Sequence, residues 1–158
     1  MTKKNIFGLV VAVLGSEMAG IVGAFFTTLS IPTWYATLIK PEWNPPAWLF
    51  GPVWTILFAM MGAAAFLIWK QGLERPDVRR ALMLFIVQLA INTLWSAFFF
   101  GARNIGGALV EIGFLWLAIV ATIIVFGRIS RAAAWLLVPY LLWVSFAAYL
   151  NYTIWILN

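Results

Sequence analysis

The chain has 158 residues, of which 65% are hydrophobic and only 9% are charged, whereas about 25% are charged in an average soluble domain. This composition indicates a membrane protein, and no polar stretch is long enough to build a second, soluble core. Cysteine and histidine are absent, which excludes disulfides, thiolate chemistry and the commonest metal and haem ligands. We therefore expect no metal site and no required cofactor. The net charge of +5 comes from ten basic residues between apolar runs, not from a stripe, so no nucleic-acid partner is expected.

Five apolar runs follow one another along the chain, each long enough to cross a hydrocarbon core with about 20 helical residues. Each run is predicted to be a helix, because backbone polar groups must be satisfied within lipid. The expected fold is an all-α integral membrane protein, a single domain built as a bundle of five transmembrane helices. The expected spans are residues 5–29, 46–69, 81–102, 104–127 and 132–157, with an outer loop at 30–45.

Basic residues are distributed unevenly between the two sides of the membrane. With five spans the termini lie on opposite sides, and only Lys40 and Arg103 fall on the C-terminal side. The positive-inside rule then places the N-terminus in the cytoplasm and the C-terminus outside. The basic residues of the N-terminal side are Lys3, Lys4, Lys70, Arg75, Arg79, Arg80, Arg128 and Arg131.

Two carboxylates, Glu17 and Glu111, fall inside predicted spans. A charge near the middle of a span costs at least about 2.5–3.5 kcal/mol, so each needs a reason. One interpretation is a proton or substrate site in the bundle. The other is a protonated or hydrogen-bonded carboxyl that ties two helices together. Their roles remain open at this stage.

The third span reads QLAINTLWSAFFFG and places Gln88, Asn92, Trp95 and Phe99 on one helical face. Amides do not face lipid readily, so this face is expected to look into the bundle. In the fifth span, helical spacing sets Pro139, Trp143, Ala147 and Asn151 on a shared face, with a bend at the proline. Such lining fits a ligand pocket, and it also fits ordinary membrane packing with amides as interhelical contacts.

Small residues recur along the first span, which lets another helix approach closely. Their partner is open, either in the same chain or in a second copy. One ladder is Gly15, Ala19 and Gly23, and the other is Ser16, Gly20 and Ala24.

The connection into the second span reads KPEWNPPAWLFGPVW. Pro45 and Pro46 stand where a helix accepts proline, and the residues before them are held extended. Pro52 removes one helical hydrogen bond. The stretch predicts a stiff, aromatic cover over the outer end of the bundle, with Trp54 one to two turns below it.

Three blocks carry a resemblance to a known family. The runs WYATLIKPEWNPP with FGPVWT, QLAINTLWSAFFFGAR with ALVE, and VPYLLWVSFAAYLNYTIW resemble the tryptophan-rich sensory protein and translocator protein family, TspO/MBR. The resemblance covers nearly the whole chain. It implies a five-helix membrane protein, commonly dimeric, that binds protoporphyrin IX, other haem-pathway tetrapyrroles and benzodiazepine-site ligands.

The family's pocket lies on the side of the first connection. The positions that match it here are Trp34, Tyr35, Trp43, Phe50, Trp54, Asn92, Trp95, Phe99, Trp143, Ala147 and Leu150. The mammalian cholesterol pattern ends in a basic residue, but LNYTIWILN contains none. This departure leaves cholesterol binding in doubt and favours a bacterial type of member, in the cytoplasmic membrane.

The leading hypothesis is a receptor or sensor for porphyrins. Two alternatives are kept: a protein that degrades porphyrin under light, and a transporter of tetrapyrroles or lipids. No nucleophile–base pair is present in the sequence motifs, so no catalytic residue is assigned.

Overall fold

The computed structural model describes residues 3–158, apart from the side chain of Lys4. Its long helices are α1 (Lys3–Ser30), α2 (Ala47–Trp69), α3 (Pro76–Ser96), α4 (Ile105–Ile129) and α5 (Arg131–Leu157). Two π-helical segments, η1 (Ile31–Tyr35) and η2 (Ala97–Gly101), continue α1 and α3. Within the described residues these form five helices that are long and apolar enough to cross a membrane. The expected all-α architecture is confirmed.

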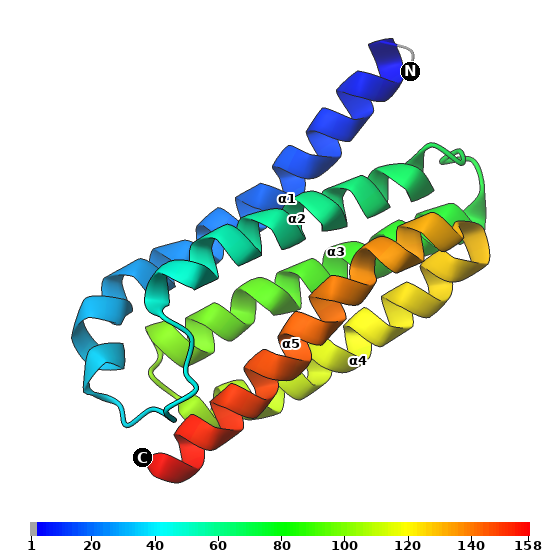
Figure 1. The fold of residues 1–158 in the computed structure, drawn as a ribbon. Helices are drawn as coiled ribbons and strands as arrows, with labels where there is room; N and C mark the ends of the chain where they lie inside the picture. Colours follow the sequence, from blue (N-terminus) through cyan, green and yellow to red (C-terminus); the bar gives the residue numbers. More distant parts are fainter. Residues whose placement is uncertain (1–2) are drawn as a thin grey trace.

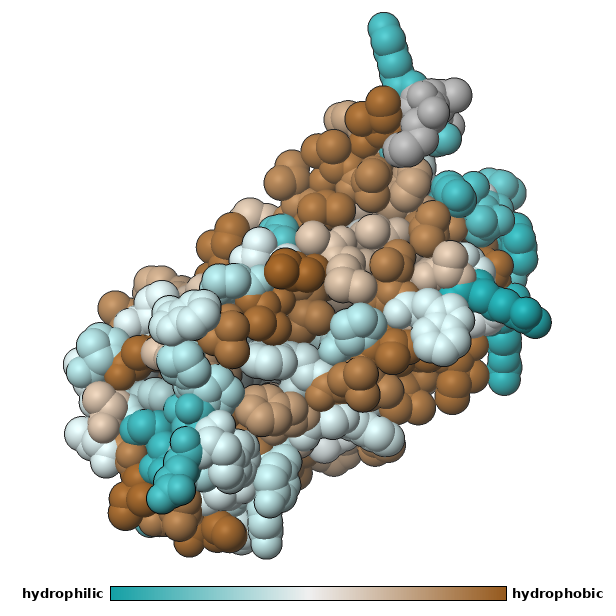
Figure 2. Space-filling model, viewed as in Figure 1, coloured by the Kyte–Doolittle hydropathy of each residue, from teal (hydrophilic) through white to brown (hydrophobic). Residues whose placement is uncertain are grey.

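The helices run roughly side by side along one long axis, and the N-terminal part of α1 projects beyond the others (Figure 1). The α2–α3 and α4–α5 connections lie at the same end as the N-terminus. The C-terminus and the η1–α2 loop (residues 36–46) lie at the opposite end. Hydrophilic residues gather at these two ends, while hydrophobic residues dominate the sides between them (Figure 2). This distribution suits a protein whose sides face lipid and whose ends face headgroups and water.

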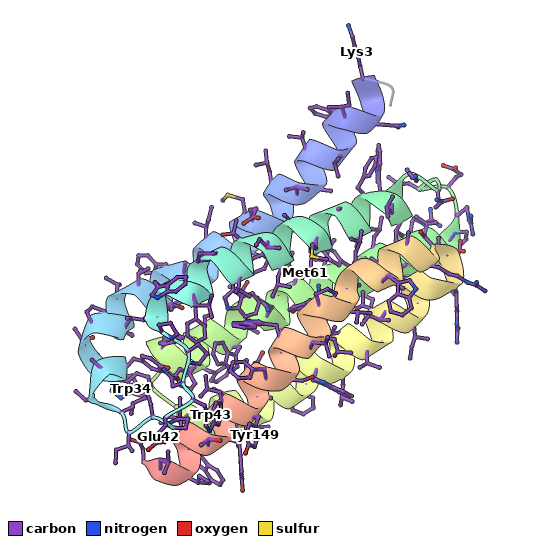
Figure 3. The ribbon with its side chains drawn as sticks, viewed as in Figure 1. Lys3, Trp34, Glu42, Trp43, Met61 and Tyr149 are labelled. Carbon is purple, nitrogen blue, oxygen red and sulfur yellow. The ribbon has the colours of Figure 1, made fainter. Side chains whose placement is uncertain are left out.

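The half of the bundle nearer the N-terminal end is packed by apolar side chains of α2, α3, α4 and α5. Met61 and Ile68 of α2 are fully buried there, as is Val78 of α3. Figure 3 shows Met61 between the helices. Close packing of this half fixes the helices that extend from it toward the η1–α2 loop.

Helices α1 and α2 approach most closely where glycine removes a side chain. A Cβ built on Gly62 would lie 2.5 Å from Cα of Val13, and one built on Gly20 would overlap the Phe58 ring. The ladder that contains Gly20 therefore packs against a helix of the same chain. This agrees with one of the two interpretations of the small residues in the first span.

Short, capped turns join the later helices. Arg103 adopts a left-handed conformation with φ of 54°, which reverses the chain between η2 and α4. Oδ1 of Asn104 accepts a hydrogen bond from the Gly107 amide at 2.8 Å and caps α4. Oγ of Ser130 caps α5 through the Ala133 amide. These turns make α3, α4 and α5 antiparallel neighbours.

Two boundaries differ from the sequence-based expectation. The expected outer loop of residues 30–45 begins as helix, because η1 continues α1 through Tyr35 and the next two residues are still helical. Pro32 has no amide hydrogen to donate, so it interrupts the α-helical hydrogen bonds where the chain passes into the π-helical segment. Helix α3 starts at Pro76, not at residue 81, because the polar turn 76–80 extends the helix beyond the apolar run. The length of an apolar run in the sequence indicates how much of a helix faces lipid, not how long the whole helix is.

Candidate ligand-binding site

A cavity of about 450 Å³ lies in the half of the bundle nearest the η1–α2 loop. Residues of α1, α2, α3 and α5 and of both π-helical segments line it, and α4 contributes none. The volume falls within the roughly 300–1,000 Å³ typical of small-molecule sites. Figure 3 shows aromatic side chains crowded between the helices in this half. The aromatic lining residues are Tyr35, Trp48, Phe50, Trp54, Phe58, Trp95, Phe99, Phe100 and Trp143.

Most of the site residues expected from the sequence lie around this one cavity. Those that line it are Tyr35, Phe50, Trp54, Asn92, Trp95, Phe99, Trp143, Ala147 and Leu150. Trp34 and Trp43 do not line it. Trp34 packs edge-on against Phe99, with ring centroids 5.7 Å apart, and so supports the wall from behind. Trp43 lies outside, stacked on Tyr149.

The π-helical segment η2 turns two consecutive rings toward the inside of the bundle. Both Phe99 and Phe100 are buried. Trp95 stacks on Phe99 at 5.1 Å and meets Phe100 edge-on at 5.9 Å. The result is a continuous aromatic wall on the α3 side.

Two asparagines line the cavity, and one is fully engaged within the protein. Oδ1 of Asn151 accepts a hydrogen bond from the Trp95 indole at 3.1 Å. Its Nδ2 donates to the Ile105 carbonyl at 3.0 Å. These bonds join α5 to α3 and to the start of α4. Asn151 therefore holds the wall in place and offers a ligand no free atom.

Asn92 is held from behind and keeps one atom free. Its Nδ2 donates to the Tyr140 hydroxyl at 2.9 Å, and that hydroxyl donates to Oε1 of Gln88 at 3.1 Å. Gln88 and Tyr140 are 1% and 0% exposed. Oδ1 of Asn92 has no partner within the described chain and is not among its fully buried unpaired atoms. The cavity therefore contains an open hydrogen-bond acceptor on an otherwise apolar wall.

The two membrane carboxylates occupy different environments. Glu17 lines the cavity on the α1 side and is half-buried. Glu111 of α4 lies away from the cavity lining, and both its oxygens are buried with no partner in the described structure. Neither carboxyl forms a hydrogen bond that ties two helices together. Among the described residues no cluster of three or more acidic, His or Cys side chains is placed to bind a metal ion.

The η1–α2 loop is fastened at several points over the end of the cavity. Trp43 stacks on Tyr149 of α5 with ring centroids 5.3 Å apart and an interplanar angle of 10°; both are labelled in Figure 3. The side chain of Asn158 pairs with the backbone of Ile39 through two hydrogen bonds of 2.9 Å. The Tyr35 hydroxyl donates to Oδ1 of Asn44 at 3.0 Å. The loop is thus bonded to α5 and to η1 rather than free.

The cavity reaches the surface sideways, between α1 and α2. Ala24 and Thr28 of α1 line it and are exposed, as are Gly51 and Thr55 of α2. A Cβ built on Gly51 would meet nothing within 4 Å, so the space beside it is empty. In a membrane this lateral opening faces the acyl chains. We call it the α1–α2 opening.

Sequence reasoning missed the α1 wall and Tyr140. The small-residue ladders of α1 were a usable signal, because Gly20 and Gly23 both line the cavity. On α5, Pro139 is exposed and does not share the cavity with Trp143. In an α-helix, side chains four residues apart differ in direction by about 40°. Over the twelve residues from Pro139 to Asn151 this difference accumulates, so the four side chains do not all share one face. Tyr140 points inward instead, which only the three-dimensional packing reveals.

The fold and the cavity define an integral membrane protein whose five-helix bundle contains an aromatic pocket, a class to which membrane receptors and sensors belong. The chain belongs to the TspO/MBR family, whose model matches residues 10–156. It is 50% identical over 139 residues to the tryptophan-rich protein TspO of Chlorobaculum tepidum, with 88% of each chain covered. It is 41% identical over 144 residues to the human translocator protein, covering 90% of this chain and 85% of that one. Over 125 residues it is 40% identical to the tryptophan-rich sensory protein of Cereibacter sphaeroides, covering 79% and 77%. The expected family is confirmed.

Proposed function

We propose that this protein is a membrane receptor or sensor that binds porphyrins, such as protoporphyrin IX and related haem-pathway tetrapyrroles, and planar ligands of the benzodiazepine-site type. The observation that carries the proposal is the cavity of about 450 Å³ with aromatic walls and a single open amide oxygen on Asn92. Names of relatives as sensory and translocator proteins agree with a receptor or sensor role.

A flat, apolar macrocycle suits these walls. Aromatic pairs contribute about 0.5–1.5 kcal/mol each beyond the burial of their area. Trp54 of α2 and Trp143 of α5 stand on different helices, and each is braced by a further ring. The ring centroids of Trp54 and Tyr140 are 6.2 Å apart, and those of Phe50 and Trp143 are 5.9 Å apart. Both indoles are therefore held in place before a ligand arrives, which lowers the entropic cost of binding.

A hydrogen-bond donor on the ligand has a defined partner in the cavity, the side chain of Asn92. Oδ1 of Asn92 accepts hydrogen bonds, so it can pair with an N–H or O–H group at the edge of a planar ligand. The lining contains Glu17 and no Lys or Arg. Carboxylate substituents of a porphyrin are therefore not expected deep in the cavity. They are expected at its end beside the η1–α2 loop, where the bundle meets headgroups and water.

The test is a titration of protoporphyrin IX into purified protein in nanodiscs, followed by ligand absorbance. Trp54→Phe combined with Trp143→Phe should raise the Kd at least about tenfold, because two large stacking surfaces shrink. The matched control is Trp116→Phe with Trp135→Phe, since neither residue lines the cavity. Unchanged affinity in the first double variant would refute the assignment of the cavity.

We also propose that the N-terminus lies in the cytoplasm of a bacterial cell. Lys70, Arg75, Arg79 and Arg80 follow α2 or begin α3 at the N-terminal end of the bundle, and the α4–α5 connection beside Arg131 lies there too. Such an excess of basic residues favours the cytoplasmic side. Labelling of single cysteines introduced at residues 73 and 102 in intact cells would test this orientation, because the chain has no native cysteine.

A further inference from the structure

A buried hydrogen-bond chain behind the cavity ends at an unpaired atom. It runs from Asn92 through the Tyr140 hydroxyl to Gln88, with distances of 2.9 and 3.1 Å. At its far end Nε2 of Gln88 is buried with no partner. At its near end Asn92 lines the cavity, and its Oδ1 has no partner among the described residues. The chain thus has an amide at each end and a hydroxyl, which both donates and accepts, in the middle.

Such a chain of hydrogen bonds can reverse its direction when only the two terminal amide groups turn, while all other heavy atoms stay in place. A half-turn of each terminal amide exchanges oxygen and nitrogen, which have nearly the same size. Nε2 of Gln88 then donates to the Tyr140 hydroxyl, and the hydroxyl donates to Oδ1 of Asn92. Each direction contains two hydrogen bonds and leaves one atom of Gln88 unpaired. The two directions are therefore close in energy when the cavity is empty.

The direction decides what the cavity offers a ligand. In the structure Asn92 presents its oxygen, an acceptor. In the reversed chain it presents its NH₂ group, a donor. Glu17, Ser96 and Trp143 also bring polar groups to the lining, but none of them belongs to this chain of hydrogen bonds. Asn151 and the Trp95 indole are bonded to each other, and the hydroxyls of Thr27 and Thr55 donate to carbonyls of their own helices.

We propose that Gln88, Tyr140 and Asn92 form a reversible hydrogen-bond relay through which the cavity accepts planar ligands bearing either a hydrogen-bond donor or an acceptor. Asn92 contacts the ligand, while Gln88 and Tyr140 are positioning residues that determine which group Asn92 presents. The inference rests on the proposed function, because it concerns the polarity of ligands bound in the same cavity.

Gln88→Met tests the relay, because the thioether removes the amide at the far end while preserving side-chain length. The Tyr140 hydroxyl then loses its acceptor at Gln88 and donates to Oδ1 of Asn92, which fixes Asn92 as a donor. Suitable probes are carbazole, a three-ring molecule with one N–H donor, and fluorenone, a three-ring molecule with one carbonyl acceptor. Wild-type protein should bind both. Gln88→Met should shift the ratio of the two Kd values by about fivefold in favour of fluorenone, the effect of one neutral hydrogen bond.

The hydroxyl provides an internal control. In a Tyr140→Phe background Asn92 turns freely, so adding Gln88→Met should leave the ratio of the two Kd values unchanged. Gln71→Met is the matched control for the substitution itself, because the Gln71 side chain donates to the Leu67 carbonyl and lies outside the cavity lining. Gln88→Leu serves as the second variant should Gln88→Met not accumulate in membranes.

Two results would overturn the relay. One is a ratio of the two Kd values in Gln88→Met that stays within about twofold of the wild-type ratio. A change of that size is smaller than the contribution of one hydrogen bond. The other is a shift that persists in the Tyr140→Phe background, since the signal must pass through the hydroxyl. Failure of wild-type protein to bind protoporphyrin IX, carbazole and fluorenone alike would instead refute the proposed function, and the relay with it.

Discussion

Substituting Gly51 by Phe should slow the exchange of ligand with the cavity. Gly51 lies on the exposed edge of α2 and lines the α1–α2 opening, across from Ala24 and Thr28 of α1. A Cβ built there meets nothing within 4 Å, so a larger side chain fits without displacing a neighbour. The new ring would occupy the opening between the two helices. A ligand that passes through this opening must then wait for the ring to turn aside.

The expected size of the effect follows from the cost of that movement. Moving a side chain off its preferred rotamer costs about 0.5–1.5 kcal/mol. Since 1.4 kcal/mol is a factor of ten, association should slow by about two- to tenfold. Dissociation passes the same point and should slow by a similar factor, so the Kd should change little. Replacing glycine inside a helix gains a few tenths of a kcal/mol in helix propensity. A Cβ on the residue before Pro52 opposes this gain, because it disfavours the helical conformation, so the unfolding temperature is measured together with the rates.

The assay is stopped-flow mixing of protoporphyrin IX with the protein in nanodiscs, with dissociation measured by competition. Gly113→Phe is the matched control, because Gly113 is also exposed with nothing within 4 Å of an added Cβ, but it lies on α4 outside the lining. A companion variant, Asn158→Ala, releases the η1–α2 loop from its two hydrogen bonds to Ile39. Equal rates for wild-type protein and Gly51→Phe, together with faster association in Asn158→Ala, would refute a lateral route and favour one beneath the loop.

Three further outcomes are expected. Gly62→Leu should lower the thermal unfolding temperature by several degrees, because the added Cβ meets the backbone of Val13 at 2.5 Å, whereas Gly113→Leu should not. Asn104→Ala should cost about 1 kcal/mol of unfolding free energy, as loss of a helix N-cap typically does, measured by denaturant titration in micelles; replacement by Asp should retain most of that stability. The dimethyl ester of protoporphyrin IX should bind within about threefold of the free acid in equilibrium titration, because no Lys or Arg lines the cavity to pair with a buried carboxylate.

The sequence predicts the fold well because one physical rule dominates in lipid. Every backbone polar group must be bonded within its own segment, so a long apolar run is a helix with few alternatives. The same rule explains where prediction stops. Residues 76–80 are polar and helical, and Ile31–Tyr35 is helical although prolines and aromatic residues suggested a loop. Hydropathy measures contact with lipid, and a helix extends beyond that contact wherever its hydrogen bonds can be satisfied.

Prediction of the site depends on which helix supplies the residue. Asn92, Trp95 and Phe99 of α3 and η2 could be placed inside the bundle, because an amide has few other places to lie in a membrane. Phe100 is buried within the π turn of η2, and AFFFG contains no clear signal for either feature. Tyr140 follows an exposed proline in a uniformly apolar run, so no periodicity separates it from its neighbours. Long-range pairing with Gln88 becomes visible only in three dimensions.

The distribution of bonds around the cavity indicates which of its walls can move. On one side the η1–α2 loop is bonded to α5, and Ser30 at the end of α1 donates to the Phe100 carbonyl at 2.9 Å. Thr93 of α3 donates to the Ala19 carbonyl of α1 at 3.3 Å. No side-chain hydrogen bond joins residues 16–30 of α1 to residues 47–58 of α2 in the described structure. Any widening that admits a broad, flat ligand is therefore least costly when the exposed side chains at the α1–α2 opening turn aside, because Trp54 and Phe50 of α2 stay packed against α5. The aromatic wall of α3, η2 and α5 would stay fixed during that movement, so the ligand would meet a surface that is already formed.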